Sequence, residues 1–160
     1  MSIPAPLELH HENVRPEWID YNGHMNVAFY VLAFDHATDA FLDYLGLDHG
    51  YKDRAEVTTF VADMNVTYVQ EVVEGAPLRF TTQLLDFDEK KFRYFHSMYH
   101  AEEGFLAATN ELLSLHIDLA TRRVGVMSAE IVERLRSVHA AHAALETPAG
   151  AGRVLGMRRR

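Results

Sequence analysis

The sequence predicts an α+β fold, in which an antiparallel β-sheet wraps around one long central α-helix and a second helix follows near the C-terminus. Two observations predict it. Residues 25–45 place apolar side chains at helical spacing, and the segments after them, up to residue 118, are rich in β-branched residues and separated by short turns. Consecutive strands joined by short turns form an antiparallel meander, and such a sheet can bury an apolar helix.

Composition supports one ordinary globular domain. The chain has 160 residues, of which 48% are hydrophobic and 24% charged. Cysteine is absent, which excludes disulfides and thiolate metal sites, and the net charge of −8 argues against nonspecific nucleic-acid binding. No apolar run reaches the roughly 20 residues of a membrane span, and the N-terminus has no signal-peptide pattern. We therefore expect a cytoplasmic protein without nucleic-acid or membrane partners.

The long helix is expected from Met25 to Leu45, and Gly46 is its natural stop. Its polar residues are confined to a narrow strip, and the rest of its circumference is apolar. We therefore expect it to be largely enclosed by the rest of the fold. The apolar stripe consists of Val27, Tyr30, Val31, Phe34, Thr38, Phe41, Leu42 and Leu45.

The remaining elements follow from alternation and from turn residues. The expected strands are 7–14, 58–73, 78–86, 92–100 and 105–118. A helix over 128–144 would have Ser128 as its N-cap. The domain is expected to span 1–145, and residues 146–160 read as a mobile basic tail. Its arginines Arg153, Arg158, Arg159 and Arg160 are either solvated or in contact with the phosphates of a cofactor.

The segment before the long helix holds the candidate chemistry. Asp20 precedes the helix closely enough to act as a cap, or as a nucleophile or general base. The amides of Gly23 and His24, near the positive end of the helix dipole, would polarise a carbonyl oxygen. Asn26 and Tyr30 would orient water or line an acyl pocket.

The run from Val14 to Tyr30 resembles the signature of the 4-hydroxybenzoyl-CoA thioesterase branch of the hotdog superfamily. Asp20, Gly23 and His24 hold the signature positions, with Asn26 after them and Tyr30 one helical turn on. The resemblance implies a hotdog fold and hydrolysis of an acyl-CoA thioester. It also implies a homodimer or homotetramer, and no cofactor, since CoA is part of the substrate.

The run from Pro16 to Met25 is also similar to betainyl-CoA thioesterases of carnitine degradation, including modules fused to carnitine dehydrogenase. A betainyl group carries a quaternary ammonium, which aromatic faces bind by cation–π attraction. Trp18, Tyr21 and Tyr30 are therefore candidate substrate contacts. Thr59 and Phe60, which open the long strand, are further candidates for lining the site.

Two other functions remain open from the sequence. Asp20 and His24 are near enough to serve as the acid and base of a hotdog enoyl-CoA hydratase or dehydratase. A non-catalytic acyl-CoA-binding protein is the alternative from another class. No metal is expected, because surface histidines or hydrogen-bonded core histidines explain the histidine pairs better. His10 and His11 face opposite sides of a strand, and His96 and His100 share a strand face but are too far apart. His139 and His142 share a helix face.

Overall fold

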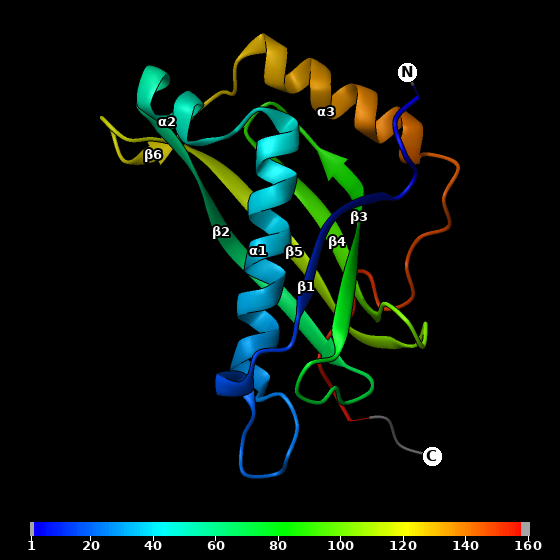
Figure 1. Ribbon diagram of the computed structural model, residues 1–160. Helices are drawn as coiled ribbons and strands as arrows, with labels where there is room; N and C mark the ends of the chain where they lie inside the picture. The colour runs from blue at the N-terminus through cyan, green and yellow to red at the C-terminus, as the bar shows by residue number, and fades with distance from the viewer. Residues whose placement is uncertain (1, 158–160) are drawn as a thin grey trace.

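The computed structural model describes residues 2–157. The strands are β1 (Leu7–Asn13), β2 (Val57–Tyr68), β3 (Pro77–Phe87), β4 (Lys91–His100), β5 (Leu106–Asp118) and β6 (Arg123–Val124). The helices are the short 3-10 helix η1 (Pro16–Trp18), α1 (Val27–Leu45), α2 (His49–Ala55) and α3 (Ala129–His142). The sheet order is β1-β3-β4-β5-β2, with β6 beside β5 and every pair antiparallel. Figure 1 shows the sheet curling around α1, which confirms the predicted hotdog fold.

Local signals set the ends of α1. Asn26 caps its start, because its side-chain oxygen accepts a hydrogen bond from the Ala28 amide at 3.0 Å. Gly46 ends it in the left-handed conformation with a φ of 85°, which glycine adopts without steric cost. The predicted stop is confirmed, and the start lies two residues later than expected.

The buried face of α1 packs against the sheet in two clusters. Near the start of the helix, Phe34 meets Phe80 edge to face, with ring centroids 5.8 Å apart. Near its end, Phe41 packs on Tyr94 at 5.1 Å and Leu135 of α3 closes the cluster. Each buried side chain of this size stabilises the fold by about 1.5–3 kcal/mol.

The expectation that α1 is largely enclosed is wrong for a single chain. Seven of its residues are buried, and they form one face only. Val27 is 58% exposed and Leu32 is 38% exposed. Apolar residues outside the buried face therefore leave surface open to solvent within a single chain.

Two elements were missed because neither has an apolar pattern. Helix α2 has no buried residue, so its sequence shows no stripe, although Asp48 caps it by accepting from the Tyr51 amide at 2.8 Å. Strand β6 has only two residues and both are exposed.

The predicted strand over 58–73 corresponds to β2, which ends at Tyr68 rather than at Val73. The Met25 amide donates to the Val72 carbonyl and holds that segment in a loop.

Part of the segment after α3, which was expected to be a tail, docks on the sheet at Gly152 and Arg153. Arg153 Nη2 donates to Asn65 Oδ1 at 2.6 Å and to Thr67 Oγ1 at 2.9 Å, both on β2. The Gly152 amide donates to the Glu111 carboxylate of β5. Arg158, Arg159 and Arg160 lie outside the described residues. Within residues 2–157, no helix is both long and apolar enough to cross a membrane.

Candidate active site

Residues 19–26 form a short loop at the N-terminal end of α1, seen in blue below the helix in Figure 1. Ile19 and Met25 pair across its neck as an isolated antiparallel bridge. Within the loop, the Asp20 amide donates to the His24 carbonyl at 3.1 Å, and the Gly23 amide donates to the Asp20 carbonyl at 3.0 Å. Gly23 has a φ of 83°, a conformation that side chains disfavour. The backbone therefore fixes Asp20 before any substrate is present.

Asp20 is half-buried, and its carboxylate bonds within its own loop instead of capping α1. Its Oδ1 accepts from the Asn22 amide at 2.8 Å, which is an Asx turn. The alternative of a helix cap is wrong, since Asn26 holds that position. The predicted amides also need correction: Gly23 and His24 precede the first turn of α1, and the Gly23 amide is already bonded to Asp20.

His24 lies beside an acidic partner that sequence reasoning missed. Its Nε2 is 3.2 Å from Oε2 of Glu71, which belongs to the loop after β2. The two residues are 47 positions apart in the sequence, so no local pattern pairs them. Tyr21, one residue beyond Asp20, is 98% exposed and free to contact a ligand that approaches this loop.

Tyr30 connects the loop to the end of β2. It is only 3% exposed and meets the Tyr68 ring edge to face at 5.1 Å. Burial raises the pKa of Tyr30 above its ordinary value of 10.0, and the charges of Glu71 and Asp20 raise it further. Tyr68 in turn donates its hydroxyl to the Val27 carbonyl at 3.0 Å. Tyr30 therefore lies within the electrostatic influence of Asp20 and Glu71.

Trp18 and Asn26 have structural partners. Trp18 is 2% exposed and stacks on Phe29 at 5.8 Å, with the Arg15 guanidinium 5.1 Å from its ring centroid. Its faces are therefore occupied by the chain itself, and the predicted substrate contact is corrected to a core role. The side-chain oxygen of Asn26 is used as the cap of α1.

Thr59 and Phe60 lie near the end of β2 that is far from the Asp20 loop. They open β2, whereas the Asp20 loop adjoins its last residue, Tyr68. Thr59 lines a cleft of about 310 Å³ between the C-terminal half of α1, helix α2 and β2. The cleft also contains Asp39, which lies about 18 Å further along α1 than Val27 at 1.5 Å per residue. One chain therefore does not bring the two predicted halves of the site together.

The cleft has an excess of carboxylates and one tyrosine ring. Asp39, Asp43 and Asp48 line it together with Tyr51, and Lys52 is the one lysine or arginine among the described lining residues, so carboxylates outnumber cations there. Partial burial raises the pKa of Asp39 above its ordinary value of 3.8, and the charges of Asp35 and Asp43 raise it further. Several carboxylates beside a tyrosine ring suit a cationic ligand.

Known proteins resemble the chain over most of its length. Residues 14–135 match the thioesterase-like superfamily. A betainyl-CoA thioesterase of Pseudomonas aeruginosa is 38% identical over 144 residues, which cover 90% of this chain and 91% of the relative. A putative thioesterase of Pseudomonas putida KT2440 has a TM-score of 0.83 at 30% identity, over 99% of this chain and all of that chain. A hypothetical protein of Staphylococcus aureus, solved in complex with CoA, has a TM-score of 0.89 at 24% identity over 99% of this chain and all of that chain.

Proposed function

This chain belongs to the thioesterase-like superfamily, and from that premise we propose that it hydrolyses betainyl-CoA to betaine and CoA, with Asp20 driving the reaction. The observation that best supports this proposal is the Asp20 loop. A half-buried carboxylate is fixed there by the Asn22 amide and lies close enough to the buried Tyr30 to affect its pKa. The likeness to a betainyl-CoA thioesterase over nine-tenths of the chain supports the acyl group.

Asp20 acts on the thioester carbon in one of two ways. Its carboxylate either attacks that carbon or removes a proton from a water that attacks it. In both, the C–S bond breaks and CoA leaves as a thiol after it takes a proton. In the first route the acyl group is left on Asp20 as an anhydride, which a water then hydrolyses to release betaine and restore the carboxylate. Negative charge develops on the carbonyl oxygen and needs a donor. Because the Gly23 amide already donates to Asp20, this role falls to the His24 amide in our proposal.

A homodimer would complete the site. Strand β2 is at the edge of the sheet, where unpaired backbone groups favour addition of another strand. Exposed apolar residues lie on β2 and on the adjoining part of α1: Val27, Leu32, Phe60, Val61, Met64 and Tyr68. Antiparallel pairing of two β2 strands would set the Val57 end of one beside the Tyr68 end of the other. Thr59 and the acidic cleft of one copy would then adjoin the Asp20 loop of its partner.

The acidic cleft supports a cationic acyl group. In such a dimer, Asp39 and Asp43 would lie near the trimethylammonium group, and Tyr51 would offer an aromatic face. A cation over an aromatic ring gains about 0.5–2 kcal/mol, or about 2- to 30-fold in binding. A neutral acyl group of the same shape gains nothing from these charges.

The test is release of free thiol from a panel of CoA thioesters. The panel holds betainyl-CoA, its neutral isostere tert-butylacetyl-CoA, acetyl-CoA and one aromatic acyl-CoA. We expect the highest kcat/KM for betainyl-CoA and loss of turnover in Asp20→Asn. Equal turnover of betainyl-CoA and tert-butylacetyl-CoA would contradict the substrate. No thiol release from any thioester would favour the hydratase or the binding protein instead.

A further inference from the structure

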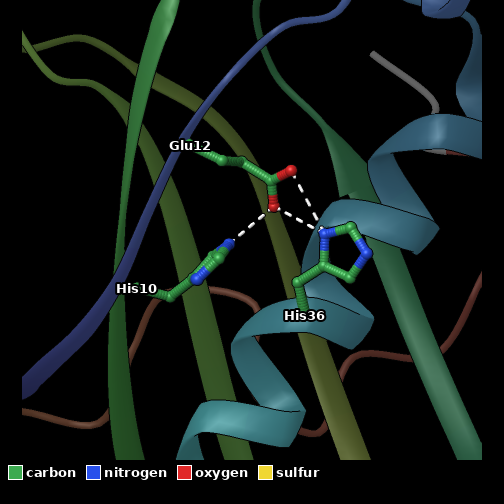
Figure 2. Close-up of side chains that lie close together, drawn as sticks. All are labelled: His10, Glu12 and His36. Carbon is green, nitrogen blue, oxygen red and sulfur yellow. Dashed lines mark hydrogen bonds and ion pairs between the residues drawn. The ribbon is translucent and has the colours of Figure 1, made fainter.

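Three side chains from two distant elements meet between β1 and α1, well away from Asp20. Nε2 of His10 lies 2.6 Å from Oε2 of Glu12, and Nδ1 of His36 lies 2.8 Å from the same oxygen. Nδ1 of His36 is also 3.1 Å from Oε1 of Glu12. Figure 2 shows the Glu12 carboxylate between the two imidazole rings, which point toward it from opposite sides.

The fold orients these side chains toward one another. His10 and Glu12 are two positions apart on β1 and so lie on the same face of the strand, toward α1, whereas His11 lies on the other face. The His10 ring packs on Phe80 at 5.2 Å and edge to face on His36 at 5.9 Å. All three residues are half-buried, so the cluster is partly shielded from solvent yet still reachable by an ion.

We propose that His10, Glu12 and His36 bind one divalent transition-metal ion of the zinc class. Two imidazoles and one carboxylate are a ligand set that zinc and related ions accept. Their candidate ligand atoms all lie within 4.8 Å of one another. Ligands at about 2.0–2.1 Å from a tetrahedral zinc are about 3.3 Å apart. The two nitrogen–oxygen distances would therefore widen by roughly 0.5–0.7 Å when the metal replaces the shared hydrogens.

The proposed ion would have three protein ligands and a fourth position for water. It would connect β1, at one edge of the sheet, to the middle of α1. His36 lies six residues beyond Tyr30, or about 9 Å along the helix, so the ion would hold the helix without touching the Asp20 loop. A hydrogen-bonded clamp without metal is the competing explanation of the same geometry.

The test is equilibrium dialysis of the untagged full chain against zinc, with magnesium as the hard-cation comparison. We expect one zinc per chain and no retained magnesium, because magnesium prefers all-oxygen ligands. His36→Gln and Glu12→Gln should each weaken zinc binding by more than about 100-fold, since even outer-shell partners contribute 10- to 100-fold. Zinc should also raise the Tm of the unaltered chain and leave the Tm of His36→Gln unchanged.

His11→Gln is the matched control. His11 is the adjacent histidine, and its Nε2 also lies 2.8 Å from a glutamate, Glu8, but on the exposed side of the strand. Zinc binding should survive this change. Zinc that is retained equally by His36→Gln, or lost equally from His11→Gln, would overturn the proposed site.

Visible absorption of bound cobalt gives a second measurement of the site in the folded, unaltered chain. Bound Co²⁺ should show the intense visible absorption of a tetrahedral nitrogen and oxygen site, and zinc should abolish that absorption by displacement. Absence of zinc binding to the unaltered chain, or cobalt absorption that persists in His36→Gln, would leave only the hydrogen-bonded clamp and overturn the proposal.

Discussion

Asp20, in the loop before α1, and Asp118, the last residue of β5, each accept a hydrogen bond from a backbone amide two or three residues further along the chain. Asp20 Oδ1 accepts from the Asn22 amide at 2.8 Å, and Asp118 Oδ1 accepts from the Thr121 amide at 2.8 Å. Both side chains are half-buried. Asp20 is the one of the two whose charge helps to raise the pKa of the buried Tyr30, so the two positions share a structural role and differ in the proposed chemistry.

Asp20→Asn should therefore separate catalysis from loop structure. Asparagine keeps the acceptor oxygen and removes the charge, so we expect Tm to be unchanged and kcat to fall about 10²- to 10⁴-fold. Asp118→Asn, which makes the same change in another carboxylate that bonds a nearby backbone amide, should retain kcat. Thiol release and thermal unfolding measure the two effects. Equal activity of the two variants would argue that Asp20 only closes its loop.

The two-copy site predicts complementation between inactive chains. Asp20→Asn and Asp39→Lys should each be inactive toward betainyl-CoA. When they are refolded together at equal amounts, random pairing should restore about a quarter of the unaltered activity, because half of the dimers would hold one intact site out of two.

A chain with both changes is the control for that experiment. Mixed equally with unaltered chain, it should leave about a quarter of the activity if the site spans two copies, since mixed dimers would then hold no intact site. It should leave about half if each chain holds its own site. No recovery with the single variants, together with half activity here, would contradict the shared site.

Asn26→Ala should destabilise the protein through the lost cap of α1. We expect a loss of about 1 kcal/mol in the free energy of unfolding, measured by urea denaturation. Asn26→Asp keeps the accepting oxygen and should cost less. Ser128→Ala removes the corresponding cap of α3, where the serine hydroxyl accepts from the Ile131 amide, and gives the comparison. Loss of kcat in a stable Asn26→Asp would instead restore the catalytic role expected from the sequence.

His96 should make the fold sensitive to acid. It is 0% exposed, its ring nitrogens are bonded to Thr38 and Thr82, and burial lowers its pKa from 6.5 to about 3. Below pH 6.5, His96 therefore binds a proton in the unfolded chain but stays neutral in the folded chain. This contribution to stability is complete above pH 6.5 and is lost as the pH falls toward 3, at up to about 1.4 kcal/mol per unit.

Urea denaturation at several pH values between 7 and 4 measures that slope. His96→Gln should be less stable at neutral pH but show a shallower loss of stability toward acid. The exposed His11→Gln should keep the slope of the unaltered chain. A slope that does not change in His96→Gln would assign the acid sensitivity to other groups, such as His116 and His142, whose pKa values burial also lowers.

The sequence by itself determined the features that depend on neighbouring residues. The apolar spacing from Val27 to Leu45 and the cap position of Ser128 follow local rules, and so do the strands joined by short turns. The Asp20 loop was also predictable, because its contacts close within six residues: Ile19 pairs with Met25.

Only the tertiary structure decided which distant residues meet. Glu71 lies beside His24, Arg153 docks on Asn65, and His36 reaches Glu12 from 24 positions away. The tertiary structure also places Thr59 and Asp20 far apart, because they lie near opposite ends of β2. Such pairings depend on how the sheet curls around its helix. The periodicity of side chains within one strand or helix does not predict that curvature.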